Sequence, residues 1–244
     1  MSQINRIDGG LIDQEKVLNF TFNGQILKGY EGDTLASALL ANNKHLIGRS
    51  FKYHRPRGIV TAGSEEPNAI MEIGNGAYKE PNTRATVTQL YNGLEANSQN
   101  HKGPLSFDFM AITDFLSPLL GAGFYYKTFM WPKAFWEKFY EPAIRKSAGL
   151  GTLSTEADPD TYDKGFRHCD ILIIGAGATG LSAALTAANS GAIIILADED
   201  FLMGGRLNSE TNEIDGMAGS EWVKKTVAKL SAMENVTLMT DTTV

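Results

Sequence analysis

Cysteine is nearly absent from this sequence, which contains a single one, Cys169, among 244 residues. One thiol cannot close a disulfide within the chain, and an iron–sulfur cluster or a structural zinc usually takes about four ligands. We therefore expect no iron–sulfur cluster and no metal site. Because disulfides accumulate in oxidising compartments, their absence indicates a reducing one, and we expect a cytoplasmic location.

Basic charge and long hydrophobic runs are also scarce. Lys and Arg number 22 against 28 Asp and Glu, which gives a net charge of −6. Nucleic acids and anionic membranes attract basic surfaces, so we expect neither as a partner. The most apolar stretch, residues 115–126, is much shorter than the roughly 20 residues of a transmembrane helix. Residues 1–19 lack the apolar core of a signal peptide.

The first hundred residues open with the pattern of a β-hairpin. Val17–Phe22 and Gln25–Tyr30 have the composition of strands. Between them lies Asn23-Gly24, a dipeptide that accommodates the two positive φ angles of a type I′ turn. A helix over about residues 35–42 is expected to follow this hairpin.

Asp33 or Thr34 can cap this helix, because both side chains accept hydrogen bonds from free backbone N–H groups. Ala69–Ile73 and Thr86–Leu90 have the composition of short strands. A hairpin followed by a helix is how a ubiquitin-like or ferredoxin-like β-grasp domain begins. We therefore predict such a domain over residues 1–100.

Aromatic residues are concentrated in the segment Pro104–Pro142, which holds 12 of the 23 in the chain. Four of them share one face of a predicted helix, with spacings of one, four and five residues. These are Phe135, Trp136, Phe139 and Tyr140. We interpret residues 101–165 as a helical connector that packs on a core or on a partner subunit, and that ends in a polar linker at residues 149–165.

A glycine-rich turn between a strand and a helix carries the clearest signal for a ligand. Ile171–Ile174 is a continuous apolar run, as expected of a parallel strand buried on both faces. The turn that follows consists of Gly175, Ala176, Gly177, Ala178, Thr179 and Gly180. In such a turn the first glycine permits a tight bend, the second lets the backbone approach a pyrophosphate, and the third lets the helix pack on the strand. We predict that these six residues bind the pyrophosphate of a dinucleotide at the helix N-terminus.

A carboxylate follows the second strand of this region. Ile193–Ala197 is apolar and leads into Asp198 and Glu199. Asp198 comes 23 residues after Gly175, close to the roughly 20 expected for an acid that binds the ribose. Such an acid bonds a 2′-hydroxyl and repels a 2′-phosphate, so we expect NAD or FAD rather than NADP. Asp198 is the preferred ribose ligand and Glu199 the alternative.

Gly204, Gly205 and Arg206 come shortly after these acids. In flavoproteins with two dinucleotide sites, a glycine pair and a basic or small residue commonly lie against the cofactor at this point. We therefore expect these three residues to contact the cofactor, with an ordinary loop as the alternative. Further along, the pattern predicts a helix over residues 221–231 and a third strand over residues 236–239.

These patterns predict a chain of mixed α/β and α+β class with three parts. Residues 1–100 form a cluster-less ferredoxin-like β-grasp domain, residues 101–165 form the connector and linker, and residues 166–244 form the first half of a Rossmann-type FAD/NAD-binding domain. A dinucleotide binds across a switch point that further strands complete. We therefore expect the chain to be a fragment of a longer protein.

The segment Gly48–Ala69, which reads GRSFKYHRPRGIVTAGSEEPNA, is the most specific stretch. Together with Asp170–Gly180 and Asp198–Arg206, it makes the chain resemble the N-terminal part of the alpha subunits of heterotetrameric sarcosine oxidases. In cluster-bearing relatives, such as hydrogen cyanide synthase subunits, a similar Arg-Pro-Arg-Gly turn leads into cysteines that hold a [2Fe–2S] cluster. Because Ile59–Ala69 has no cysteine, the resemblance implies a ferredoxin-like fold that has lost its metal.

The resemblance also implies a function. That family oxidises sarcosine to glycine and hydrogen peroxide, with formaldehyde or 5,10-methylenetetrahydrofolate as the one-carbon product. Its alpha subunit holds NAD in the domain seen here, and the beta, gamma and delta subunits complete the heterotetramer. FAD and FMN are expected elsewhere in the complex, and tetrahydrofolate binds a part of the alpha subunit beyond Val244. The resemblance thus implies an oxidoreductase fragment that binds NAD and has no catalytic residue or activity of its own.

Two other functions remain open from the residues. The first is an FAD-binding electron-transfer subunit of a related opine dehydrogenase or cyanide-forming glycine dehydrogenase. The second is a non-catalytic scaffold in which the glycine turn binds nothing. The basic cluster of the specific segment has two interpretations as well, since it either faces an anionic cofactor or forms a structural loop anchored to carboxylates such as Glu65 and Glu66. Its members are Arg49, Lys52, His54, Arg55 and Arg57.

Overall fold

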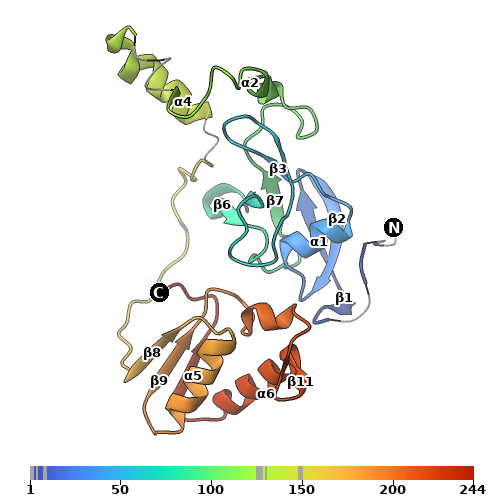
Figure 1. Ribbon diagram of the computed structural model, residues 1–244, viewed down its shortest axis with the longest axis vertical. Helices are drawn as coiled ribbons and strands as arrows, with labels where there is room; N and C mark the ends of the chain where they lie inside the picture. The colour runs from blue at the N-terminus through green and yellow to red at the C-terminus, as the bar shows by residue number, and fades with distance from the viewer. Residues whose placement is uncertain (1–2, 4, 8–9, 125–128, 130, 148–150) are drawn as a thin grey trace. The chain divides into compact units, whose positions relative to one another are not determined.

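A computed structural model describes residues 3, 5–7, 10–124, 129, 131–147 and 151–244. The chain divides into two compact units (Figure 1). Unit 1 consists of Met1–Ile7 and Ile12–Pro159, and unit 2 of Asp8–Leu11 and Asp160–Val244. The division at Pro159 falls inside the polar stretch expected to be a linker, of which residues 149–150 lie outside the described residues.

A five-stranded sheet with the order β2-β1-β7-β5-β6 forms the centre of unit 1. Its strands are β1 (Asp13–Phe22), β2 (Gln25–Glu31), β5 (Ile70–Ile73), β6 (Glu80–Arg84) and β7 (Glu95–Ser98). The β1–β7 pair is parallel and the other neighbouring pairs are antiparallel. A small additional pair joins β3 (Gly48–Arg49) to β4 (Pro56–Arg57). The β1–β2 hairpin is the predicted one, with positive φ at both Asn23 and Gly24.

Helix α1 (Leu35–Ala41) packs its apolar residues against this sheet. Thr34 is its N-cap and forms a capping box with Ser37, which settles the two alternatives for the cap. Asp33 has a different role, because its buried carboxylate forms an ion pair with Arg6 and accepts a hydrogen bond from the hydroxyl of Ser37. The core beneath α1 is built from large side chains that are almost fully buried, including Phe20, Leu35, Leu39, Met71 and Leu94.

The predicted strand at Thr86–Leu90 is wrong. Its backbone bonds instead to the start of α1, since Leu35 N–H donates to the carbonyl of Thr88 and Leu90 N–H donates to that of Asp33. Only one isolated bridge, between Thr34 and Gln89, has strand geometry. The strand composition of this segment was therefore overridden by a tertiary contact with the helix.

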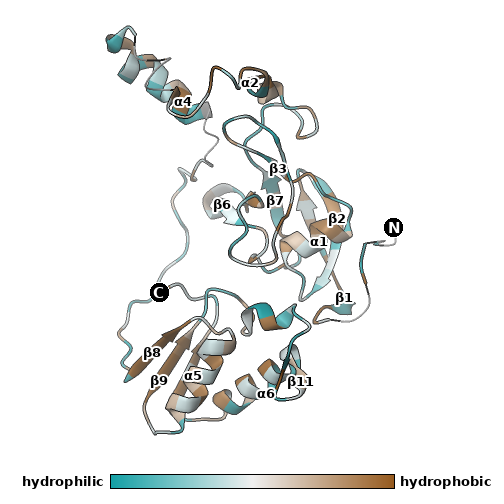
Figure 2. Cartoon of the chain, viewed as in Figure 1, coloured by the Kyte–Doolittle hydropathy of each residue, from teal (hydrophilic) through white to brown (hydrophobic). Residues whose placement is uncertain are grey.

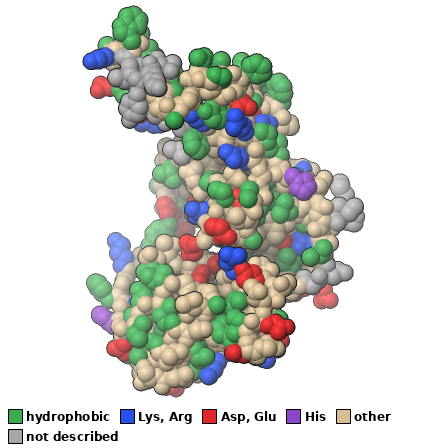
Figure 3. Space-filling model, viewed as in Figure 1, with side chains coloured by type: hydrophobic (Ala, Val, Ile, Leu, Met, Phe, Trp, Pro, Cys, Tyr) green, Lys and Arg blue, Asp and Glu red, His purple; other side chains and the backbone are tan. Residues whose placement is uncertain are grey.

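The aromatic-rich connector contains short helical pieces. They include the 3₁₀ helices Phe109–Ala111 and Lys133–Phe135, α2 (Ile112–Phe115), a π-helical turn over Trp136–Tyr140, and α4 (Glu141–Ser147). Hydrophobic side chains are prominent on the surface of this segment (Figure 3). Phe139 is 59% exposed and contacts Phe135 at a ring distance of 5.1 Å. Among the described residues, none of the four aromatic side chains of this face belongs to either hydrophobic core, and packing on a core or on a partner stays a prediction.

The apolar stretch at residues 115–126 lies partly outside the described residues. Within the ranges that the structure covers, none of the helices has both the length and the apolar character needed to cross a bilayer.

The basic cluster, which lies in β3, in β4 and in the loop between them, attaches the connector to this small strand pair. The Arg49 guanidinium donates to the carbonyl of Leu105 at 2.8 Å, and Arg55 forms an ion pair with Asp114 at 2.7 Å. Nδ1 of His54 lies 2.5 Å from the carboxylate of Asp108. These three basic residues thus have structural partners. Two of the partners are carboxylates, as expected, but they are Asp108 and Asp114 of the connector and not Glu65 or Glu66.

Unit 2 is built on a parallel sheet with the order β12-β9-β8. Its strands are β8 (Ile171–Ile174), β9 (Ile194–Ala197) and β12 (Val236–Met239), and its helices are α5 (Ala178–Ala188) and α6 (Gly219–Ser231). A short hairpin, β10 (Glu213–Ile214) and β11 (Met217–Ala218), precedes α6. In chain order these strands are arranged 3-2-1, as are the first three of a doubly wound sheet.

The two outer strands of this sheet are less buried than the middle one. Strand β9 is buried at all four positions. Strand β8 was expected to be buried on both faces, and that is wrong for the described residues, because Ile174 is 65% exposed and both Ile171 and Leu172 are also exposed. Figure 2 shows β8 and β9 as continuous apolar strands. Only Ile173 of β8 packs into the core of unit 2.

Candidate functional site

The glycine turn of unit 2 links the C-terminal end of β8 to the N-terminus of α5. Gly175 has a φ of +96°, and its N–H donates to the carbonyl of Ala197 at 2.7 Å. Gly177 is the N-cap of α5 and has extended backbone angles. Helix α5 begins at Ala178. The predicted residues Ala178, Thr179 and Gly180 therefore form its first turn.

The three glycines meet different steric conditions. A side chain at Gly175 would be strained by the positive φ angle. A Cβ at Gly180 would overlap the carbonyl oxygen of Gly175, which shows how closely the helix approaches the turn. Gly177 has an ordinary φ, and a Cβ there would have no atom within 4 Å. The fold thus requires glycine at two of these positions, while Gly177 borders open space that a ligand can enter.

The first turn of α5 offers hydrogen-bond donors to that space. The helix has no acidic residue in its first turn, and no side chain caps its N-terminus. The first N–H groups of a helix have no partner within the helix, and the helix dipole adds partial positive charge at the same end. This end of α5 is therefore suited to a phosphate group.

Asp198 joins the end of β9 to the glycine turn. One carboxylate oxygen accepts a hydrogen bond from the N–H of Ala176, and the other accepts one from the N–H of Asp200 at 2.8 Å. The predicted ribose ligand is thus brought next to the turn, but it also holds the turn in place. A carboxylate has about four lone-pair positions, so Asp198 retains acceptor capacity for a ribose hydroxyl. Glu199, the alternative ligand, is exposed beside it.

Asp200 is a member of this site that the sequence analysis missed. Burial, together with the negative charge of Asp198, raises the pKa of Asp200 to about 6. The charges of Glu199 and Asp241 act in the same direction, while the N–H of Phe201 opposes the shift. The signal was available as the third acid in the run Asp198-Glu199-Asp200. The burial of Asp200 and the approach of Asp241, which follows β12, are set by the tertiary fold and so could not be inferred locally.

The glycine pair Gly204–Gly205 also lies against the glycine turn. The N–H of Gly204 donates to the carbonyl of Ala176 at 2.9 Å. A Cβ at Gly205 would lie 3.4 Å from the Cα of Gly177. The structure thus brings both glycines to the predicted site. The side chain of Arg206 is 83% exposed and forms an ion pair with Glu210 at 2.7 Å, so its contact with a cofactor stays a prediction.

The acids around the turn restrict the ligand. Asp198, Glu199 and Asp200 follow β9 directly, where the adenosine ribose of a dinucleotide lies in doubly wound folds. Like charges repel, so this run disfavours a 2′-phosphate. Among the described residues, no group of three or more His, Cys, Asp or Glu side chains is arranged to hold a metal ion. The arrangement thus offers backbone N–H donors at the start of α5 and carboxylate acceptors after β9.

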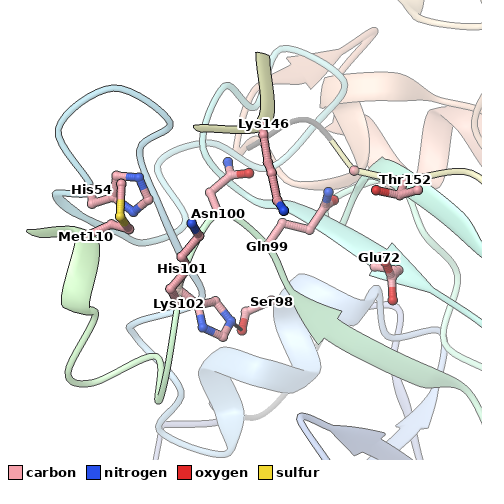
Figure 4. A pocket seen from close by; sticks show the side chains of 11 residues that line it. His54, Glu72, Ser98, Gln99, Asn100, His101, Lys102, Met110, Lys146 and Thr152 are labelled. Atoms are coloured by element: carbon pink, nitrogen blue, oxygen red, sulfur yellow. Dashed lines mark hydrogen bonds between the residues drawn. The ribbon is translucent and has the colours of Figure 1, made fainter. Parts of the chain in front are cut away.

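A separate polar cavity of about 220 Å³ lies in unit 1 (Figure 4). Its lining includes His54, Asn100 and Lys146. Within the described part of the chain, Nε2 of His54 and Oδ1 of Asn100 are buried without a hydrogen-bond partner. Burial raises the pKa of Asp108, but hydrogen bonds from backbone N–H groups and from His54 outweigh it, so the pKa is lowered overall. The His54–Asp108 pair holds the connector and is not part of the glycine-turn site.

Two families match the chain in sequence. Residues 15–101 match the family described as a 2Fe-2S iron-sulfur cluster binding domain, and residues 170–239 match the family described as FAD dependent oxidoreductase. The first match supports the ferredoxin-like fold of unit 1. However, residues 15–101 contain no cysteine, so the residues present do not fit a cluster held by thiolates.

The chain is similar to sarcosine oxidase alpha subunits over nearly all of its length. The chain is 59% identical to that of Rhizobium meliloti (strain 1021), over 96% of this chain and 24% of the relative. It is 33% identical to that of Corynebacterium sp. (strain U-96), over 97% of this chain and 20% of the relative. The chain thus spans about a quarter or less of the length of these relatives. L-proline dehydrogenase from P. horikoshii shares the fold, with a TM-score of 0.51 at 18% identity, over 94% of this chain and 34% of that one.

Proposed function

Because this chain is related to sarcosine oxidase alpha subunits over nearly all of its length, we propose that it is the dinucleotide-binding part of such a subunit. One observation supports this proposal more than any other. Gly177 borders open space at the start of α5, although the fold itself does not require a glycine there. Where the fold itself does not require glycine, a glycine is expected if the protein backbone must come close to a bound pyrophosphate.

We propose NAD as the ligand, in the first half of a Rossmann-type domain. Its pyrophosphate would accept hydrogen bonds from the N–H groups of the first turn of α5. Its adenosine ribose would bond to Asp198, with Glu199 beside it. Gly204 and Gly205 would form the opposite wall of the site, since both lie against the turn. When bound, the dinucleotide supplies hydride chemistry, and the chain supplies binding and orientation.

FAD is the second candidate, because residues 170–239 match a family described as FAD dependent. The residues of this site contact the adenosine diphosphate half, which NAD and FAD share, so the geometry serves either one. The resemblance to sarcosine oxidases favours NAD. NAD and FAD are distinguished by denaturing the purified chain and identifying the cofactor that it releases. Oxidised flavin has visible absorption and fluorescence, whereas NAD has neither and is reduced by an added dehydrogenase.

For the whole protein, we propose the oxidation of sarcosine to glycine with hydrogen peroxide and formaldehyde or 5,10-methylenetetrahydrofolate. In this proposal FAD, FMN and tetrahydrofolate bind outside the present chain, and the beta, gamma and delta subunits complete a cytoplasmic heterotetramer. The 244 residues alone would bind NAD and oxidise nothing. Adding sarcosine to the isolated chain should therefore produce no peroxide, while the assembled complex should produce it. Peroxide formation by the isolated chain would refute this division of roles.

A further inference from the structure

A buried carboxylate lies at the centre of the loop between β4 and β5. Glu66 is 1% exposed and accepts five hydrogen bonds, four of them from backbone N–H groups. One oxygen is bonded by the N–H groups of Val60 and Thr61 and by the Thr61 hydroxyl, at 2.6–3.1 Å. The other is bonded by the N–H groups of Asn68 and Ala69, at 2.7 and 3.1 Å. The loop is thus folded around a single anionic group.

The hydrogen bonds determine the charge of this group. Burial alone would raise the pKa of Glu66, but the N–H groups of Thr61, Asn68 and Val60 and the Thr61 hydroxyl outweigh burial and lower it. All five donors present hydrogen to the carboxylate, so a neutral acid or amide would leave some of them facing another donor. Charged hydrogen bonds of this kind are stronger than neutral ones. The loop therefore needs an anion at this position to keep its donors satisfied.

The resemblance to cluster-bearing relatives, in which an Arg-Pro-Arg-Gly turn like Arg55–Gly58 leads into the cluster cysteines, would place those cysteines in this loop. Residues 15–101 match a 2Fe-2S cluster binding family but contain no cysteine. The sulfurs of such clusters are anionic acceptors of hydrogen bonds from the surrounding chain. We propose that Glu66 supplies, from within the chain, the anionic centre that a cluster supplies in that family, so that unit 1 is organised to fold without a metal. This inference goes beyond the dinucleotide site, and it stands or falls independently of it.

Hydrogen exchange at individual amides tests this role. In the wild-type chain, the amides of Val60, Thr61, Asn68 and Ala69 should be protected nearly as well as those of the sheet. Glu66→Gln keeps the size of the side chain but replaces an acceptor with a donor. It should accelerate exchange at these four amides by roughly 10- to 100-fold, as expected when hydrogen bonds to a charged group are lost. The matched control is Glu65→Gln, which changes an exposed neighbour and should leave the four rates unchanged.

Reconstitution provides a second test that requires no variant. The purified wild-type chain is incubated anaerobically with ferrous iron, sulfide and a thiol reductant, and is then desalted. The proposal expects no stoichiometric iron or sulfide and no visible cluster absorption. A stable cluster in unit 1 would overturn it. Unprotected amides at the four positions in the wild type would also overturn the proposal, and this measurement does not depend on how the variant folds. Unchanged protection of the four amides in Glu66→Gln would overturn it as well.

Discussion

The sheets of the two units differ in how completely the described residues cover them. In unit 1, the strands and α1 enclose a continuous core in which Phe20 and Met71 are almost fully buried. In unit 2, β9 is buried throughout, whereas β8 presents Ile171, Leu172 and Ile174 to solvent. The glycine turn follows β8 directly. The comparison indicates that unit 1 obtains its stability from its own packing, while the site of unit 2 rests mainly on backbone geometry and on Asp198.

The largest expected effect comes from the core of unit 1. Phe20→Ala removes a ring that is 1% exposed, and it should lower the free energy of unfolding of unit 1 by about 3–5 kcal/mol. Native-state hydrogen exchange of the sheet amides measures this for unit 1 separately. Ile26→Ala on the adjacent strand is the matched control, since Ile26 is 74% exposed and surface changes are usually within about 0.5 kcal/mol. Equal effects would contradict the core that we describe.

In unit 2, the next largest effect is expected at the glycine turn. Gly180→Ala places a Cβ on the carbonyl oxygen of Gly175. Overpacking of this kind should destabilise unit 2 by roughly 1–3 kcal/mol, and it should also abolish dinucleotide binding because the turn must shift. Exchange of the β9 amides reports the stability. Gly165→Ala, whose Cβ would meet no atom within 4 Å, should change neither property.

Asp200→Asn should stabilise unit 2 near neutral pH. The pKa of Asp200 is 3.8 in a model peptide and about 6 in the folded chain. The folded state therefore binds the proton more tightly, and the stability it gains below about pH 4 is lost as the pH rises through about 6. The asparagine variant lacks this loss, and above pH 6 it should be more stable than the wild type by on the order of 1 kcal/mol. This is less than the full pKa shift would give, because solvent screens the charge of a partly exposed group. Chemical unfolding across this pH range measures the difference, and a pH-independent difference would contradict the assignment.

The smallest effect is expected on β8. Ile174→Ala should change stability by less than about 0.5 kcal/mol, because this side chain is 65% exposed. Leu196→Ala on the neighbouring β9 is the comparison, and it should cost about 2–5 kcal/mol because Leu196 is fully buried. Similar costs at the two positions would show that β8 is covered, and the contrast between the two sheets would then disappear.

Elements that depend on local patterns were predictable from the sequence. The hairpin at Asn23-Gly24, the strands β8 and β12 and the glycine turn all follow from backbone preferences and apolar runs. The structure of Thr86–Leu90 was not predictable from its composition, because its backbone bonds to the start of α1 and not to a strand. The partners of Arg55 and the hydrogen bonds of Glu66 were also missed. Each depends on a contact set by the tertiary fold or by loop geometry, which residue spacing does not encode.

Calorimetric titration of the chain with NAD tests the central claim most directly. The wild-type chain should bind one NAD, and Gly177→Ala should weaken binding by at least about tenfold, since its Cβ enters the space assigned to the pyrophosphate. The variant should lose no more than about 1 kcal/mol of stability, the usual cost of alanine at a helix N-cap, because that space contains no atom of the chain within 4 Å. Equal NAD affinity in the wild type and in Gly177→Ala, or no heat with either NAD or FAD, would contradict the account.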